Sequence, residues 1–153
     1  MDAELVNAYV DNAFVQMLLV AERTGPALNE RPFGPTTNSV ASLIIHCAAV
    51  CEFWLGHVIL GRPSDRNRDA EFDATADLEG LRTRVERCIV QVAADLEALA
   101  GLPELGERPD GPSELREFAL GGGSDESVVQ HVLQELHQHL GQMELTADAF
   151  AAR

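Results

Sequence analysis

Four long segments of the chain repeat their apolar residues every three or four positions, and this repeat restricts the fold more than any other feature of the sequence. The segments span about residues 2–23, 39–60, 77–100 and 124–151. Such spacing places the apolar side chains on one face of an α-helix. A glycine followed closely by a proline ends each of the first three segments. The sequence therefore predicts an all-α fold, in which residues 1–153 form a single domain.

The lengths of the connections predict how the helices are ordered. Residues 62–76 separate the second predicted helix from the third, and residues 101–123 separate the third from the fourth. Both connections are longer than antiparallel neighbours in a bundle need. We expect residues 62–76 to cross the length of the bundle, so that the second and third helices run parallel. The predicted architecture is a four-helix bundle in up-down-down-up order, with this long crossover between helices 2 and 3 and a short additional helix around residues 113–120.

The charge of the chain excludes several classes of partner. The formal net charge is −14, and all 11 basic residues are arginines. Such acidity repels phosphate backbones and anionic membrane surfaces, so we expect no nucleic acid and no membrane as partners. No basic, apolar leader is visible, and a cytoplasmic location is expected. The three cysteines, Cys47, Cys51 and Cys88, are then expected to be reduced and buried as small hydrophobic residues, with a metal or redox pair as the alternative.

Three of the five histidines lie in the last predicted helix, where His131, Glu135 and His139 recur every four residues. This spacing puts them on one helix face. Because residues 131 and 139 lie about 12 Å apart along the axis, one metal ion can bind only one adjacent pair, either His131 with Glu135 or Glu135 with His139. The third ligand must come from another helix. His46 and His57 are available on the second helix, and His57 is expected at the rim of the bundle.

A set of two histidines and one carboxylate would suit zinc, nickel or ferrous iron. Three protein ligands would also leave a position open for water or substrate, as in catalytic sites. Two simpler interpretations remain open. His46 lies in the most apolar part of the chain and could be a structural histidine with a polar partner. The polar face of the last helix could simply contact water, as we expect for His137.

Two segments resemble a known family. Residues 38–46, Asn-Ser-Val-Ala-Ser-Leu-Ile-Ile-His, followed by Glu-Phe-Trp-Leu at residues 52–55, resemble the second helix of the DinB/YfiT-like superfamily. Residues 135–142, Glu-Leu-His-Gln-His-Leu-Gly-Gln, resemble its final helix. The resemblance implies an up-down-down-up four-helix bundle with a metal site made of His46, Glu135 and His139. Many members of the superfamily carry a histidine as the middle ligand, where this chain has Glu135. In this respect the chain is similar to the mycothiol-dependent branch, which includes the metal-binding domain of maleylpyruvate isomerase.

The resemblance also implies a function, that of a metal-dependent thiol S-transferase. Zinc is the expected metal, with nickel or iron as alternatives, and mycothiol or a similar low-molecular-weight thiol is the expected cofactor. Its thiolate would attack a small electrophilic substrate. The pocket is expected to include Trp54, His131, Arg66 and Arg68, and either arginine could bind a substrate carboxylate; a solvated crossover is the alternative for both. The alternative functions are a non-catalytic metal-binding or stress-related bundle and a dimerisation module, and a homodimer is expected.

Overall fold

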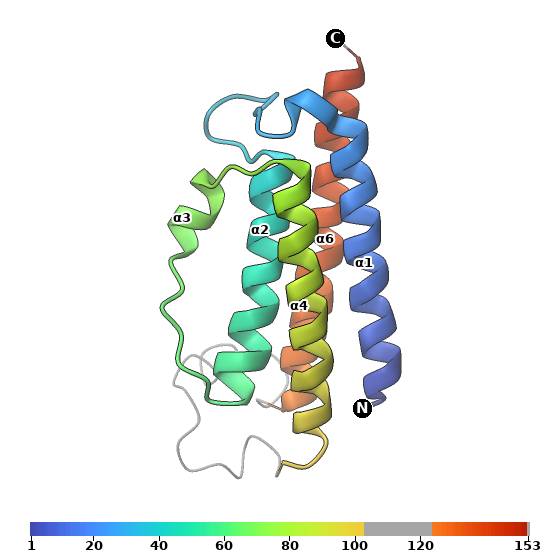
Figure 1. Cartoon of the computed structure of the whole chain (residues 1–153), viewed down its shortest axis with the longest axis vertical. Coiled ribbons are helices and arrows are strands. Elements are labelled where there is room, and N and C mark those ends of the chain that lie inside the picture. Colours follow the sequence, from blue (N-terminus) through green and yellow to red (C-terminus); the bar gives the residue numbers. More distant parts are fainter. Residues whose placement is uncertain (103–123, 153) are drawn as a thin grey trace.

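The computed structural model describes residues 1–102 and 124–152, and within them it contains helices and no strand (Figure 1). This confirms the prediction of an all-α fold. The elements are α1 (Ala3–Thr24), the 3-10 turn η1 (Gly25–Ala27), α2 (Val40–Cys51), the π-helix η2 (Glu52–Ile59), α3 (Arg68–Asp73), α4 (Leu78–Leu99) and α6 (Asp125–Ala151). The short helix expected around residues 113–120 lies outside the described residues.

Each of the four long helices begins at a side chain that satisfies a free backbone N–H group. These N-cap residues are Asp2, Ser39, Asp77 and Ser124. An oxygen at this position accepts a hydrogen bond from an N–H group that has no partner within the helix. The caps place the start of each helix within about two residues of the predicted bounds.

The second helix forms the centre of the core. Ten of the twelve residues of α2 are buried, and η2 continues it without a break in the helical path. Residues 40–59 are long and apolar enough to cross a membrane, but 67% of their most apolar 18-residue window is buried inside the bundle. Its apolar character therefore fits a helix that is packed into the core of the bundle.

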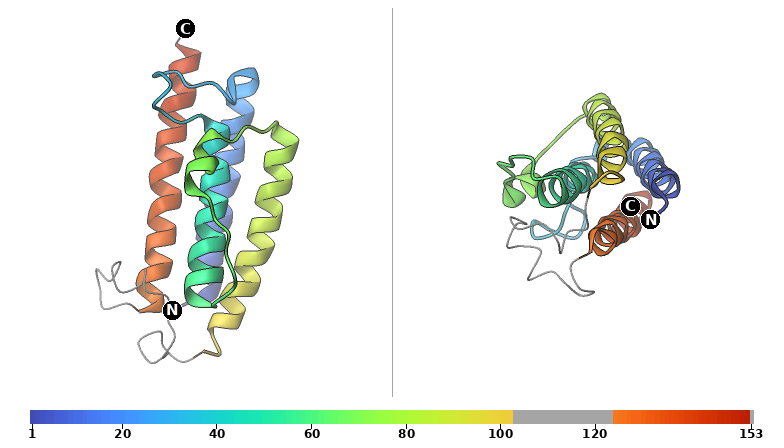
Figure 2. Two further views of the ribbon diagram at one scale, coloured as in Figure 1. Left: turned by 90° about the vertical axis from the view of Figure 1, so that its left-hand side faces the viewer. Right: turned by 90° about the horizontal axis from the view of Figure 1, so that it is seen from below.

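The helices run in two directions, as Figures 1 and 2 show. In Figure 1, α1 and α6 run upward, whereas α2 and α4 both begin at the upper end and run downward. Residues 60–77 return from the lower end of η2 to the upper end of α4 along the outside of α2, and they carry α3 (Figures 1 and 2). This segment, with its helix α3, is called the crossover below.

Residues 68–73 of the crossover form a short helix that the sequence pattern did not predict. The side chain of Asn67 accepts a hydrogen bond from the backbone N–H of Ala70 at 3.1 Å and starts the six-residue helix α3. Six residues are too few to show an apolar repeat, so a periodicity argument cannot find such a helix. The helix matters because it turns Glu71 and Phe72 toward His46 on α2.

A second difference concerns the end of the predicted second helix. The sequence predicts a regular α-helix to about residue 60, but residues 52–59 wind as a π-helix. π-Helical turns are rare in proteins, and those that occur are often found at functional sites. The π-helix carries Phe53 and Trp54, two of the aromatic residues beside the candidate site.

Candidate metal centre

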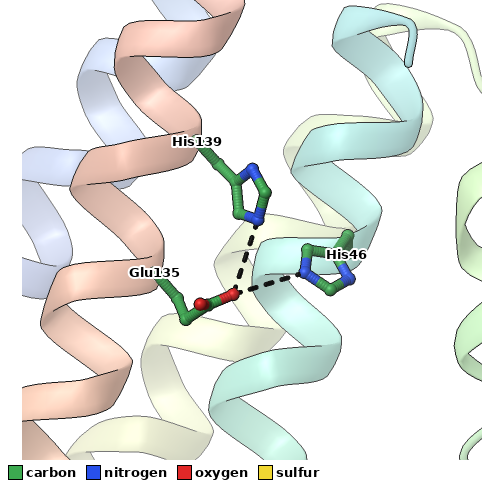
Figure 3. Close-up of side chains that lie close together, drawn as sticks. All are labelled: His46, Glu135 and His139. Atoms are coloured by element: carbon green, nitrogen blue, oxygen red, sulfur yellow. Dashed lines mark ion pairs between the residues drawn. The ribbon is translucent and has the colours of Figure 1, made fainter. Parts of the chain in front are cut away.

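Three side chains from two helices converge between α2 and α6 (Figure 3). His46 comes from α2, and Glu135 and His139 come from successive turns of α6. One possible ligand atom from each lies within 4.8 Å of the others. Oε2 of Glu135 lies 3.7 Å from Nε2 of His46 and 3.5 Å from Nε2 of His139. Ligand atoms around a tetrahedral zinc ion lie about 3.3 Å apart, so Glu135 lies near the required spacing from each histidine. The three atoms together lie within 4.8 Å and would have to draw closer to hold one ion.

The Nε2 atom of His46 supports this interpretation independently. The His46 side chain is buried, and its Nε2 has no hydrogen-bond partner among the described residues. Its Nδ1 atom lies 2.8 Å from a carboxylate oxygen of Glu71, which can only accept, so Nδ1 carries the proton and Nε2 carries a lone pair. A buried acceptor without a partner costs about 1–3 kcal/mol. A bound metal ion would satisfy this lone pair.

Burial has a direct effect on the protonation of His46. Loss of solvation lowers the pKa of His46, and this effect outweighs the hydrogen bond to Glu71, which raises it. The imidazole is therefore neutral near pH 7, which is the form that binds metals. The ring of Phe72 stacks against the imidazole of His46, with ring centroids 4.5 Å apart, and restrains its orientation.

Glu71 belongs to the centre but was not among the site residues expected from the sequence. It lies on α3, is 8% exposed, and pairs with both His46 and the guanidinium of Arg66. Burial alone would raise the pKa of Glu71, but the hydrogen bonds from Arg66 and His46 hold it below the usual value. The carboxylate is therefore ionised. A histidine ligand whose second nitrogen donates to a carboxylate is a common arrangement in metal sites.

A cleft of about 480 Å³ opens beside the three residues. His46 and Glu135 belong to its walls, and the other lining residues are Val50, Phe53, Trp54, Arg66, Arg68 and His131. All four pocket residues expected from the sequence are thus found at this cleft. The volume is within the range of small-molecule sites. His131 packs its ring against Trp54, with centroids 4.8 Å apart, and is not part of the three-residue cluster.

The two remaining histidines lie away from the cluster. Nδ1 of His57 hydrogen-bonds to the carbonyl oxygen of Arg62 at 2.7 Å, and Nδ1 of His137 to the carbonyl oxygen of Leu133 at 2.7 Å. His137 is exposed, as the sequence indicated. Each ring thus hydrogen-bonds to a backbone carbonyl group four or five positions away in the sequence. Neither ring is directed at the candidate ligands.

The three cysteines are free thiols in the core of the bundle. Burial raises the pKa of Cys47. The pKa of Cys51 is also raised, first by its hydrogen bond with Cys88 and then by burial. Neutral, buried thiols are poor nucleophiles and poor metal ligands. They pack as small hydrophobic residues, which was the favoured interpretation of the sequence.

The chain was compared with known protein families, curated proteins and solved structures. Residues 15–143 match the DinB superfamily. The matched range includes α2, the crossover and all three residues of the cluster. No curated protein and no solved structure matches the chain.

Proposed function

The chain belongs to the DinB superfamily, and from this membership and the His46–Glu135–His139 cluster we propose that it is a metal-dependent enzyme. We propose that it transfers a low-molecular-weight thiol, of the mycothiol type, to a small electrophilic substrate. The observation that carries this proposal is the buried Nε2 of His46, which has no hydrogen-bond partner among the described residues and faces two further potential ligands.

Each of the three side chains would have a defined task. His46 and His139 would bind the ion through neutral Nε2 atoms, and Glu135 through a carboxylate oxygen. A divalent ion held in this way supplies a Lewis acid that keeps a bound thiol in its reactive thiolate form. Three protein ligands leave room for that thiol. The donor set favours zinc, with nickel and ferrous iron as alternatives.

The proposed thiol rests on a narrower observation. The glutamate at position 135 is the feature that resembles the mycothiol-dependent branch. The adjacent cleft has room for a small ligand. Phe53 and Trp54 provide an apolar wall that would exclude water from a reacting thiolate. We place the reaction in the cytoplasm, where low-molecular-weight thiols and the three cysteines stay reduced.

Metal analysis of the untagged protein tests the proposal directly. Wild-type protein supplied with zinc should retain about one ion per chain, and His139→Ala should lose it, because two ligands hold zinc much less firmly than three. His137→Ala is the matched control, since His137 lies on the same helix and hydrogen-bonds to the carbonyl of Leu133. Equal metal content in wild type and His139→Ala would contradict the proposed centre.

Thiol-dependent turnover separates the enzyme from a non-catalytic role. The loaded protein is incubated with an electrophile such as 1-chloro-2,4-dinitrobenzene and with mycothiol, bacillithiol or glutathione in turn. Product formation that needs both the metal and the thiol supports the transferase. Firm metal binding without turnover of any pair would instead favour the non-catalytic metal-binding module.

We also propose a finer architecture and an assembly. The four long helices would correspond to the up-down-down-up bundle implied by the resemblance, with the crossover between helices 2 and 3. Two copies of the chain would pair through α1, which exposes about half of the surface of several large apolar side chains. These are Leu5, Tyr9, Val15 and Leu19.

A further inference from the structure

Arg68 is a cation without an acidic partner among the described residues of a strongly acidic protein. Most of the arginines that the structure describes pair with a carboxylate, namely Arg23, Arg31, Arg62, Arg66, Arg82 and Arg84. Among the described arginines, only Arg68 and Arg87 have no carboxylate of a described residue within 4.0 Å. Arg68 lines the cleft of the metal centre. Both side chains are exposed to solvent, and Arg87 lies away from the cleft on α4.

Aromatic contacts hold Arg68 beside the centre. Its guanidinium carbon lies 5.2 Å from the centroid of the Phe72 ring, and that ring stacks on His46. The neighbouring Arg66 is engaged differently, because its Nε and Nη2 atoms donate to both carboxylate oxygens of Glu71. A guanidinium that lies over an aromatic ring keeps its N–H groups free for a planar acceptor. Arg68 is therefore the cleft cation with unused donors.

The charges at the centre indicate what those donors would meet. The carboxylates of Glu71 and Glu135 balance the guanidiniums of Arg66 and Arg68, so a divalent ion would add two uncompensated positive charges. A bound thiolate would neutralise one of them. The second positive charge in a partly buried cleft is unfavourable unless a further anion accompanies it. Elsewhere the chain, with a net charge of −14, repels anions.

We infer that Arg68 binds a carboxylate carried by the ligands of the metal centre, so that the site selects thiols or electrophiles that bear a carboxylate group. The planar fork of the guanidinium matches a carboxylate with two parallel hydrogen bonds. Phe53 and Trp54 in the same cleft would cover the apolar body of such a ligand. This inference rests on the proposed metal centre and assigns the class of ligand that it takes.

The carboxylate can belong to the thiol or to the electrophile, and two measurements distinguish these sources. In the first, the cobalt-substituted protein is titrated with 3-mercaptopropionate and with the neutral 3-mercaptopropan-1-ol, and the visible spectrum of cobalt reports thiolate binding. In the second, protein saturated with the neutral thiol is titrated with propionate. The fluorescence of Trp54, the only tryptophan of the chain, reports occupation of the cleft.

The wild type should prefer the carboxylate-bearing probe about tenfold in at least one of the two measurements, as expected for a charge-assisted hydrogen bond. Arg68→Gln should lose this preference. Arg87→Gln removes the same charge from an exposed position on α4 and should keep it. An unchanged cobalt spectrum of Arg68→Gln in the absence of thiol shows that the fold and the three ligands are intact.

The outcomes separate this inference from the proposed function. If the wild type binds no cobalt, both the metal centre and the inference are overturned. If cobalt and thiols bind but Arg68→Gln retains the preference of the wild type, or the wild type shows none in either measurement, the inference alone is overturned. A preference carried only by the thiol, or only by propionate, identifies which ligand bears the carboxylate.

Discussion

The Nδ1 atom of His46 donates a hydrogen bond of 2.8 Å to Oε2 of Glu71, which lies 25 positions later in the chain. The bond joins the buried core helix α2 to the short helix of the crossover. It fixes the tautomer of His46 and directs the lone pair of Nε2 toward Glu135 and His139. The crossover therefore does more than connect two helices, because it orients a candidate metal ligand.

Replacement of Glu71 should weaken metal binding although the residue is not itself a ligand. Glu71→Ala removes the acceptor for His46, and we expect the affinity for zinc to fall by about 10- to 100-fold. Glu71→Gln keeps an oxygen acceptor and should lose less. Competition with a chromophoric chelator measures both affinities.

A control is needed because Glu71→Ala also changes the net charge. Asp69→Ala removes a carboxylate from an exposed position on the same helix, where no hydrogen bond links it to His46. It should leave the affinity for zinc within about twofold, since an exposed charge contributes little. A comparable loss in Asp69→Ala would show that Glu71 acts only through its charge.

The sequence predicted the parts of this site that depend on local repeats. The long helices follow from apolar spacing and N-caps, and Glu135 with His139 follows from helical geometry together with a resemblance. His46 as a ligand followed from the resemblance, because its place in an apolar helix is also typical of a structural histidine. Glu71 could not be found in this way, because its role depends on how the crossover folds back against α2. Packing of Phe72 on His46 sets that position, and such a long-range contact leaves no periodic pattern in the sequence.

A substitution at Gly56 should destabilise the π-helix. A Cβ atom at this position would overlap the guanidinium of Arg62, which donates two hydrogen bonds to the buried carboxylate of Asp95. Displacement of Arg62 would leave Asp95 without its cation, and we expect Gly56→Ala to lower the free energy of unfolding by about 1–3 kcal/mol. Chemical denaturation measures this change.

Gly141 offers the matched comparison. It also lies inside a helix, but a Cβ atom there would meet nothing within 4 Å. Gly141→Ala should therefore raise the free energy of unfolding by about 0.5–1 kcal/mol through helix propensity alone. If both substitutions stabilise the protein, the contact between Gly56 and Arg62 does not restrict the π-helix.

The stability of the metal-free protein should depend on pH through His46. Burial lowers the pKa of His46 in the folded state, whereas the unfolded chain binds this proton near the ordinary value of 6.5. Below pH 6.5 the unfolded state binds more protons than the folded state. The contribution of His46 to the free energy of unfolding is therefore fully present above pH 6.5 and is lost as the pH falls toward the folded-state pKa. The slope is at most about 1.4 kcal/mol for each pH unit in this window.

Denaturation of the metal-free protein between pH 7 and pH 5 tests this dependence. His46→Gln should show a smaller loss than the wild type. Burial also lowers the pKa of His131, so His131→Gln should reduce the loss further in the double variant. Glu71, whose pKa is held below its usual value of 4.5, contributes only at lower pH. Wild type and His46→Gln with the same pH profile would contradict a neutral, buried His46.

Charge also decides where two copies of the chain could meet. Two molecules that each carry a net charge of −14 repel one another except where a surface lacks charge. Between positions 5 and 19 the exposed residues of α1 are all uncharged, and the larger apolar ones are Leu5, Tyr9, Val15 and Leu19. A contact between copies through these exposed side chains would bury mainly apolar area, because Asp11, the one charged residue of this stretch, is half-buried.

Leu19→Glu should therefore convert a homodimer into a monomer. The substitution places a carboxylate of the same sign on both sides of the contact, and burying it unpaired should weaken association by at least about tenfold. Analytical ultracentrifugation over a range of concentrations measures the change. Val90→Glu is the control, because Val90 is 71% exposed on α4 and lies on a different helix from the proposed contact. A wild type that sediments as a monomer throughout, or equal dissociation of both variants, would exclude pairing through α1.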